Sequence, residues 1–168
     1  GAGFTDPSSA FDATDGLITS ERGVALGILT ADCFPVVLAD PRRGMLAVVH
    51  AGWRGVAAGI VGKAVATFGD ARSIVSIVGP GVGSDHYEVG EDVASAVSHG
   101  AEGDAVIRRD DGRVHLDLGA TIERSLRACG VQRVECTGIC TACEMERFFS
   151  YRRDGVTGRQ GLIAMRLA

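Results

Sequence analysis

Short apolar runs, rich in β-branched residues and bounded by Gly, Pro, Asp or Arg, recur along the chain. Such runs are typical of buried strands, and they predict strands at VALGIL (24–29), FPVVLA (34–39), MLAVV (45–49), SIVSIVG (73–79) and LIAMRL (162–167). Residues 1–14 are rich in Gly, Ser, Asp and Pro without apolar periodicity, which predicts an irregular entry segment. We expect regular structure to begin at DGLIT (15–19).

Between these strands, apolar residues recur at the spacing of helices. One set is Val56, Ile60, Ala64 and Phe68, a second is Leu118, Ile122 and Leu126 before a C-terminal cap at Gly130, and a third helical segment covers residues 91–99. Strands cluster early and then mix with helices without a regular β-α-β alternation, so the pattern predicts a mixed α/β (α+β) fold rather than a doubly wound parallel sheet. No repeat or linker divides the chain, and we expect residues 1–168 to form one domain.

Composition narrows the function classes. With 168 residues, 46% of them hydrophobic, the chain is long enough to bury a full core. A formal net charge of −4 gives no general attraction to nucleic acid or anionic lipid, so any phosphate must be held by a local basic cluster. No apolar run reaches the roughly 20 residues that span a bilayer, and no secretory signal is visible. Five cysteines, an odd number, favour reduced thiols over a disulfide framework, and we expect a cytoplasmic protein.

The predicted hairpin of residues 34–39 and 45–49 carries the clearest candidate chemistry. Cys33 precedes its first strand and His50 follows its second, so the intervening turn would bring both side chains to one edge of the sheet. A thiol beside an imidazole can be a nucleophile activated by a base, as in Cys-His hydrolases, or it can be half of a zinc site. A structural cysteine near a hydrogen-bonded histidine is the third alternative.

Two further clusters hold aromatic and basic side chains. Trp53 and Arg54 lie in the segment HAGWRG, where an indole can stack on a ring and a guanidinium can bind phosphate or carboxylate. Tyr151 offers a second stacking ring in the segment FFSYRRD, and three arginines within eight positions, Arg152, Arg153 and Arg159, could bind phosphate. Arg153 is the one that we choose as a substrate-binding residue. Each cluster has a structural alternative: Trp53 can plug the core at a strand-to-helix turn, and the arginines can be solvated partners of surface carboxylates.

Weaker signals lie elsewhere. The segment GPGVGSDHYEVG (79–90) is a poor match to nucleotide-binding loops, and the default interpretation is a glycine-rich turn that shapes a pocket rim. His86 in an H-x-E fragment, and Cys140 with Cys143 in a C-x-x-C fragment, resemble parts of a zinc deaminase signature that fails in detail. With Cys136 nearby, the C-x-x-C could also be a redox pair or half a zinc site, but plain interior thiols are the simpler interpretation.

These segments together resemble the multicopper polyphenol oxidase family, also known as laccase-domain or YfiH-like proteins. The resemblance covers nearly the whole chain through blocks in a shared order, which are DGLIT, TADCFP, VHAGWRG, GP with YEVG, DL, CT, and FFSYRR with TGR. HAGWRG and FFSYRR are specific to the family. The resemblance implies an α/β sandwich of mixed β-sheet with flanking helices. It also implies purine nucleoside phosphorylase activity, often accompanied by adenosine deaminase and methylthioadenosine phosphorylase activities.

The resemblance further implies a zinc site of one cysteine and two histidines, and Cys33 and His50 match two of these ligands. The family's other histidine lies upstream of DGLIT in a Q-x-H type motif, whereas no histidine precedes His50 here. We therefore expect either that part of the native N-terminal region is absent from this chain or that this member has lost the metal. Copper is not expected, because four histidines are too few for the centres of a multicopper oxidase.

The resulting hypothesis is phosphorolysis of a purine nucleoside by a monomer whose partners are the nucleoside and phosphate, with no nucleic acid or membrane. The predicted catalytic residues are Cys33, His50 and Arg54, with Arg54 holding phosphate, and the predicted substrate-binding residues are Asp32, Trp53, Tyr151 and Arg153. Two rival hypotheses are a Cys-His hydrolase or amidase with Cys33 as nucleophile, and a metal-depleted purine-binding domain without turnover.

Overall fold

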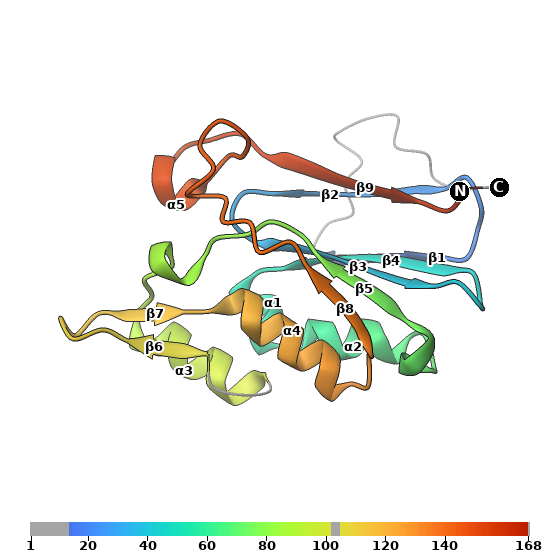
Figure 1. The fold of residues 1–168 in the computed structure, drawn as a ribbon, viewed down its shortest axis with the longest axis horizontal. Helices are drawn as coiled ribbons and strands as arrows, with labels where there is room; N and C mark the ends of the chain where they lie inside the picture. Colours follow the sequence, from blue (N-terminus) through green and yellow to red (C-terminus); the bar gives the residue numbers. More distant parts are fainter. Residues whose placement is uncertain (1–13, 102–104, 168) are drawn as a thin grey trace.

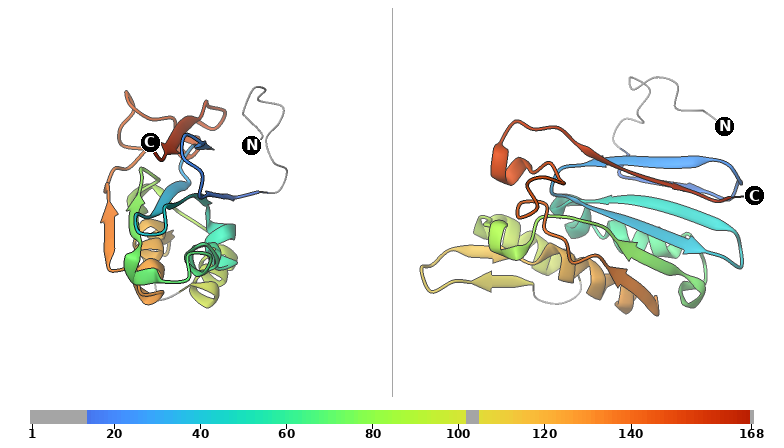
Figure 2. Two further views of the ribbon diagram at one scale, coloured as in Figure 1. Left: turned by 90° about the vertical axis from the view of Figure 1, so that its right-hand side faces the viewer. Right: turned by 45° about the horizontal axis from the view of Figure 1, so that its top comes forward.

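Three layers build the protein in the computed structural model, which describes residues 14–101 and 105–167. A five-stranded sheet lies in the middle, helices cover one of its faces, and a two-stranded ribbon covers the other (Figures 1 and 2). The predicted irregular segment at residues 1–14 falls outside the described residues except for Thr14. Within the described residues, the first regular element is β1 (Gly16–Thr19), in the segment DGLIT.

The central sheet has the strand order β1-β4-β3-β5-β8. β3 (Phe34–Asp40) and β4 (Met45–Ala51) form the predicted hairpin. Antiparallel pairing extends from β4 to β1 and from β3 to β5 (Val75–Val78), whereas β8 (Arg133–Cys136) runs parallel to β5. The mixed sheet excludes a doubly wound parallel arrangement, as the sequence predicts.

Successive side chains of β3 and β4 point to opposite faces of the sheet, so each strand contributes to two apolar clusters. Val36, Leu38 and Val49 belong to the larger cluster, which also contains the buried residues of the helices. Leu46 and Val48 belong to the smaller cluster beneath the ribbon. This burial on both faces explains why the two strands read as continuous apolar runs rather than alternating ones.

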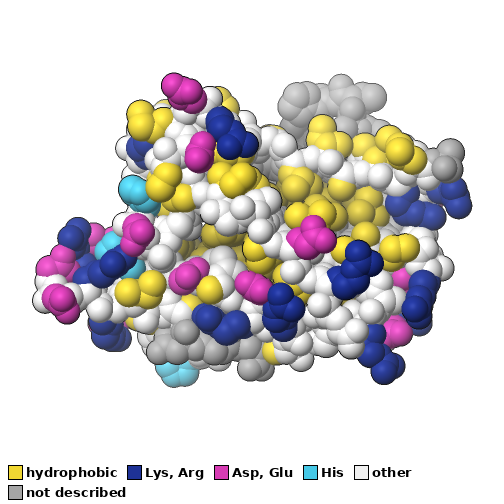
Figure 3. All heavy atoms as spheres, viewed as in Figure 1, with side chains coloured by type: hydrophobic (Ala, Val, Ile, Leu, Met, Phe, Trp, Pro, Cys, Tyr) yellow, Lys and Arg dark blue, Asp and Glu magenta, His cyan; other side chains and the backbone are white. Residues whose placement is uncertain are grey.

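The ribbon pairs β2 (Ala25–Thr30) with β9 (Gln160–Met165), so an early and a late segment of the chain lie side by side. Leu26 packs its side chain inward against the sheet. The outward residues stay in solvent: Ile163 is 77% exposed, and Figure 3 shows hydrophobic side chains gathered over this part of the surface. Both strands were predicted from their apolar runs.

The structure has two short helices where the spacing of residues 56–68 predicts one continuous helix. α1 (Trp53–Ala57) and α2 (Ile60–Ala66) are separated because Gly59 has a φ of 73°, a left-handed conformation that ends one helix and begins the next. Val56 and Phe68 are nevertheless fully buried in the core beneath the sheet. The spacing therefore identified the buried face but not the break.

The other predicted helices are confirmed. α3 covers Glu91–Gly100, and α4 covers Leu118–Ala128. Gly130 takes a φ of 92° and donates its N–H to the carbonyl of Arg127 at 2.9 Å, so it ends α4 as predicted.

Several short elements were not predicted. These are the hairpin of β6 (Val106–Arg108) and β7 (Val114–Leu116), strand β8, helix α5 (Tyr151–Asp154), and the 3-10 turns η2 (Ala71–Ser73) and η3 (Ser84–His86). Their three or four residues are too few to show a period. The mixed fold class is confirmed, and no helix among the described residues combines the length and apolar character that crossing a membrane requires.

Candidate active site

Cys33 and His50 lie together at one end of the β3–β4 hairpin. The register pairs Pro35 with His50 and Phe34 with Ala51, so Cys33, the residue before β3, lies beside the end of β4. The side chains of Cys33 and His50 lie close together, since a Cβ at Gly52 would lie within 4 Å of both. The predicted proximity is confirmed, and it follows from an antiparallel register in which the first residues of one strand face the last residues of the next.

Asp15 fixes the orientation of the His50 ring. Its Oδ1 lies 2.8 Å from Nδ1 of His50, and its carbonyl accepts the His50 backbone N–H at 2.7 Å. The neighbouring Cys33 side chain raises the pKa of His50 to about 9, with Asp15 acting in the same direction and burial opposing both. Because Nδ1 is engaged by Asp15, Nε2 is the ring atom left for Cys33 or for a metal.

Gly52 provides the room that this pair needs. A Cβ at this position would lie 3.0 Å from Sγ of Cys33 and 3.9 Å from Cε1 of His50. The first distance is tighter than ordinary van der Waals contact, so any larger side chain would displace the thiol. The glycine of HAGWRG is therefore explained by close approach to the site, not by an unusual φ.

Asp32 braces the site from within the protein. It is 7% exposed and adopts a φ of 83°, a left-handed conformation that costs free energy for a non-glycine residue. Its carboxylate accepts a hydrogen bond from Thr141 Oγ1 at 2.7 Å and another from the Arg152 backbone N–H at 2.6 Å. Both carboxylate oxygens are thus engaged within the chain, and Asp32 joins three distant segments.

A cavity of about 280 Å³ opens beside Cys33. Its lining combines one thiol, one carboxylate, two phenol rings and two guanidinium groups with small and apolar residues. The lining residues are Ala31, Asp32, Cys33, Val82, Tyr87, Leu118, Tyr151, Arg152 and Arg159. Arg152 lies over the ring of Tyr87, with 4.9 Å from Cζ to the ring centroid. Burial is the main cause that raises the pKa of Tyr87 to about 12, so its hydroxyl is a neutral hydrogen-bonding group in this wall.

The predicted substrate residues are divided by the structure. Asp32 and Tyr151 line the cavity, and Tyr151 is 61% exposed at its mouth. Arg153 instead directs its guanidinium into the protein, where its donors meet five acceptor atoms, which are the carbonyls of Thr141, Ala142 and Phe148 and both carboxylate oxygens of Asp154. Because a guanidinium has five N–H donors, Arg153 holds the neighbouring loop and has none left for a ligand.

Trp53 and Arg54 begin α1 and do not line this cavity. The Arg54 guanidinium lies 4.5 Å from the centroid of the Trp53 ring, and Trp53 packs partly against the core. Arg54 itself is exposed, and its charge is close enough to lower the pKa of Tyr87 against the larger effect of burial. The structure thus supports the core role for Trp53 and leaves Arg54 near the mouth of the site.

Two residues of the site, Asp15 and Tyr87, were not singled out from the sequence, and Arg152 and Arg159 were grouped with Arg153 as possible phosphate ligands but were not chosen as site residues. Each nevertheless lies in a block that carries the family resemblance, since Asp15 opens DGLIT and Tyr87 opens YEVG. The signal was present, but which arginine of the Arg152–Arg153 pair faces the cavity depends on the turn of α5, and no sequence pattern shows this.

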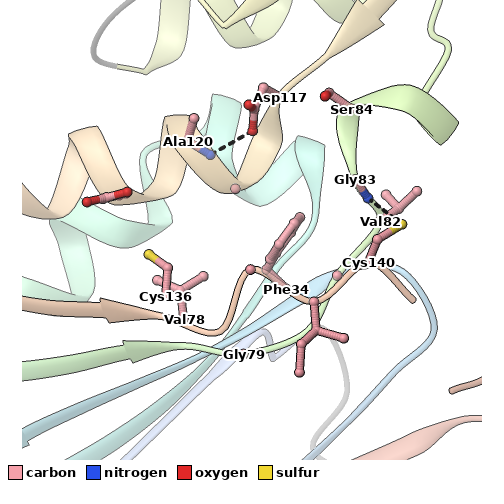
Figure 4. A pocket seen from close by; sticks show the side chains of 15 residues that line it. Phe34, Val78, Gly79, Val82, Gly83, Ser84, Asp117, Ala120, Cys136 and Cys140 are labelled. Carbon is pink, nitrogen blue, oxygen red and sulfur yellow. Dashed lines mark hydrogen bonds between the residues drawn. The ribbon is translucent and has the colours of Figure 1, made fainter. Parts of the chain in front are cut away.

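A second cavity of about 300 Å³ lies on the other side of Val82, which lines both. Phe34 projects between helix α4, which Asp117 caps, and the glycine-rich segment, as Figure 4 shows. Gly79, Gly81 and Gly83 line this cavity, which confirms the predicted pocket rim. A Cβ at Gly81 would lie 2.6 Å from the Phe34 ring, so the glycine is required there.

The remaining thiols are not interior ones, and that prediction was wrong. Cys129, Cys136 and Cys143 are exposed, and Cys140 is partly exposed. Cys140 and Cys143 lie close to His86, and the three ligand atoms are all within 4.8 Å of one another. Cys140 and Cys143 lie in a surface loop rather than in the core. Together with His86 they form a group of side chains that could hold a metal ion.

Cys33 and His50 have the donor types of a zinc site. Zinc prefers cysteine sulfur and histidine nitrogen, and a histidine ligand normally gives its other ring nitrogen to a carboxylate or carbonyl, as His50 does to Asp15. Catalytic zinc sites usually have three protein ligands. The described residues place no third His, Cys or carboxylate ligand atom with these two. The pair fits two positions of such a site.

The fold, the order of the sequence blocks and this Cys-His edge are those of a laccase-like family, and the chain belongs to that family. Residues 3–166 match the family model described as multi-copper polyphenol oxidoreductase laccase. A purine nucleoside phosphorylase from Corynebacterium glutamicum is 40% identical over 155 residues, which cover 90% of this chain and 62% of the relative. An adenosine deaminase, RL5, from an unknown prokaryotic organism is 35% identical over 160 residues, which cover 90% of this chain and 61% of the relative.

A crystal structure of the Bacillus licheniformis protein YfiH has the same fold. It superposes with a TM-score of 0.89 at 32% identity, covering 96% of this chain and 64% of that one. The chain thus spans about six tenths of the length of the relatives that it matches. The predicted sandwich fold and family membership are confirmed.

Proposed function

We propose that the protein is a purine nucleoside phosphorylase that binds its substrates in the cavity beside Cys33. The observation that carries the proposal is the convergence of Cys33, Tyr151 and Arg152 on a single cavity. Its volume of about 280 Å³ is near the lower end of small-molecule sites, which suits one nucleoside. The name of the Corynebacterium relative, 40% identical, supports the same assignment.

The reaction transfers the ribosyl group from a purine to phosphate. A phosphate oxygen forms a bond to ribose C1′ while the C1′–N9 bond breaks, and the purine leaves as it accepts a proton. The transition state resembles an oxocarbenium ion, as in glycoside hydrolysis. Arg152 and Arg159 in the wall, with Arg54 near the mouth, would neutralise the phosphate. The exposed ring of Tyr151 would stack on the purine.

Asp32 and Arg153 serve this site through positioning. Asp32 holds the Arg152 backbone and Thr141, while Arg153 fastens the loop of residues 141–148. We therefore assign Asp32 and Arg153 to holding Arg152 in place rather than to direct contact with the substrate. Trp53 similarly supports Arg54 through the contact of their side chains.

Zinc is the proposed cofactor, bound by Cys33 Sγ and His50 Nε2 with a further ligand from outside the described residues. When bound, it would act as a Lewis acid and lower the pKa of a water molecule. Asp15 would orient the His50 ring, and Gly52 would leave the Cys33 sulfur unobstructed. The native protein is expected to act as a monomer.

Adenosine deamination is a second candidate activity, supported by the relative named adenosine deaminase at 35% identity. Water would add at C6 of adenosine, and ammonia would leave, giving inosine. The activity would use the same Cys33–His50 edge, so the two reactions would compete for adenosine.

Product analysis tests both activities. The purified full-length protein is incubated with zinc, phosphate and either inosine or adenosine, and the products are separated by chromatography. Phosphorolysis gives hypoxanthine or adenine with an equal amount of ribose 1-phosphate, and deamination gives inosine from adenosine without phosphate. A folded protein that yields none of these products from either substrate would not be a phosphorylase or a deaminase.

The Cys-His hydrolase remains the chemical rival, since the Cys33 and His50 side chains already lie together. A thiol-directed probe, followed by mass spectrometry, separates the two roles. Zinc that protects Cys33 from the probe supports the ligand role, whereas unchanged labelling together with amide turnover supports the nucleophile. Calorimetric binding of a purine without turnover of any substrate would favour a binding domain.

A further inference from the structure

A second group of soft donors lies away from the Cys33–His50 edge. His86 ends the turn η3, and Cys140 and Cys143 belong to the loop that follows β8. The imidazole and the two sulfur atoms are all within 4.8 Å of one another. Residues more than fifty positions apart in the chain thus present three ligand atoms to one point.

The donor set suits zinc or a similar soft divalent cation. Zinc binds cysteine sulfur at about 2.3 Å and histidine nitrogen at about 2.0–2.1 Å, usually with tetrahedral geometry, and C-x-x-C is a frequent spacing for two of its ligands. Tetrahedral ligands at these distances are separated by about 3.5–3.8 Å. The present separations of up to 4.8 Å would close through small rotations of exposed or partly exposed side chains.

The backbone around these side chains is already paired. Gly81 donates its N–H to the Ile139 carbonyl at 3.2 Å, and Thr141 donates its N–H to the Gly81 carbonyl at 3.0 Å. The Gly83 N–H points at Cys140 Sγ from 3.2 Å, the contact drawn in Figure 4. The cluster is therefore held on a fixed backbone and needs little ordering to bind a cation.

We propose that His86, Cys140 and Cys143 form a zinc-binding site distinct from the Cys33–His50 edge. It provides three protein ligands and leaves one position for water. Within the C-x-x-C segment, Thr141 donates its hydroxyl to Asp32, and His86 directly precedes Tyr87. A bound cation would therefore connect the segment of Thr141, which holds Asp32, with the segment of Tyr87, which lines the first cavity.

Cobalt(II) is the probe, because its thiolate complexes have a charge-transfer band that zinc lacks. The full-length protein carries Cys33→Ser, which removes sulfur ligation at the first site, and is reduced before titration. We expect about one equivalent of cobalt to bind with a thiolate band. Cys140→Ser, Cys143→Ser or His86→Ala, each added to this background, should weaken cobalt binding at least about tenfold, and each Cys→Ser change should reduce the thiolate band.

Cys136→Ser is the matched control. Cys136 is also exposed and lines the same cavity as Cys140, but it is outside the three-residue group. The band should be unchanged in this variant. If the Cys33→Ser background does not fold, the difference between wild type and Cys140→Ser reports the same site.

A thermal measurement supplies an independent readout. Zinc at 100 times its dissociation constant should raise the Tm of the Cys33→Ser protein by about 5–10 °C, and this shift should be lost with Cys140→Ser. The proposal is overturned if the reduced Cys33→Ser protein shows no thiolate band, or if the band survives loss of both Cys140 and Cys143. It is also overturned if a Cys140–Cys143 disulfide forms in air and the reduced form binds neither metal.

Discussion

Two clusters of cysteine and histidine, built in different ways, lie beside neighbouring cavities that share Val82. Cys33 and His50 are placed by the register of adjacent strands, and Asp15 fixes the imidazole. His86, Cys140 and Cys143 are placed by a 3-10 turn and a loop, and two of the three are exposed. The same donor types thus occur once on a rigid sheet edge and once on the surface.

The difference indicates which cluster suits catalysis and which suits a structural metal site. A reacting group must be held to a fraction of an ångström, which strand ends achieve better than loops. The first cluster also faces a cavity with Tyr151 and Arg152, groups that can bind a ligand. The second faces the junction of two loops, where a cation would mainly reduce loop motion. Substitutions should therefore affect activity at the first cluster and stability at the second.

The largest expected effect is on turnover. Cys33→Ala should lower kcat for phosphorolysis by about 10²–10⁴-fold, because it removes a proposed metal ligand at the reacting centre. Cys140→Ala should change kcat far less while removing zinc-dependent stabilisation. Steady-state rates with inosine and phosphate, together with thermal melting, measure both. Equal losses of kcat in the two variants would contradict the assignment of turnover to the first cluster and stability to the second.

Asp15 offers a finer test of the first cluster. Asp15→Asn keeps the size of the side chain but removes the charge beside His50 Nδ1, so zinc affinity or kcat should fall by about 10–100-fold. Asp111→Asn is the control, because Asp111 is an exposed carboxylate that pairs with Arg113 in the β6–β7 hairpin. Metal titration and initial rates should leave the control unchanged. A loss of similar size in Asp111→Asn would indicate a general effect of charge.

Glycine substitutions probe the space around the thiol. Gly52→Ala would place a methyl group 3.0 Å from Cys33 Sγ and should lower kcat by about tenfold. Gly62→Ala in α2 would place one at an ordinary 3.6 Å from Cys129 Sγ, and it should raise the free energy of unfolding by about 0.5–1 kcal/mol. Rates and denaturant unfolding of both variants are compared. Full activity in Gly52→Ala would contradict the proposed tight approach.

The smallest effect lies in a region that is independent of both clusters. Ser73 Oγ donates to Asp40 Oδ2 at 2.6 Å, and this hydrogen bond is the main cause that lowers the pKa of Asp40, whose side chain is buried. A lowered folded-state pKa stabilises the protein above the unfolded value of about 4, and this contribution is lost as pH falls through the folded-state value.

Ser73→Ala should therefore lower the free energy of unfolding by about 1 kcal/mol at pH 7. The difference from wild type should shrink as pH falls below 4. Urea unfolding across this range measures it, and zinc should not alter the difference. A difference that stays constant down to pH 2 would mean that Asp40 does not titrate with folding.

The strands were predictable because their signal is local. VALGIL, FPVVLA and MLAVV are buried on both faces or on an inner face, so composition alone identifies them. β8 was missed because RVEC is mostly exposed and is a strand only through parallel pairing with β5. The break at Gly59 was missed because glycine within a helical pattern is often tolerated.

The site was predictable in part for the same reason. Cys33 and His50 were found because a hairpin brings the start of its first strand next to the end of its second. The direction of a side chain on a short helix has no comparable signal, so Arg153 was chosen where Arg152 lines the cavity. The exposure of Cys140 and Cys143 was likewise misjudged, since the surroundings of a loop depend on what packs beside it.

By itself, the sequence determined most of the strands, the main helices, the family and the meeting of a thiol with an imidazole at one sheet edge. The strands, the helices and the Cys-His pair depend on interactions between residues that are close in the chain or related by a simple hairpin, and the family is identified from short sequence blocks. Only the tertiary structure decided which arginine faces the cavity, that Asp32 joins three segments, and that His86 meets Cys140 and Cys143. These contacts join residues more than fifty positions apart, and their geometry arises from the packing of the whole sheet rather than from any local pattern.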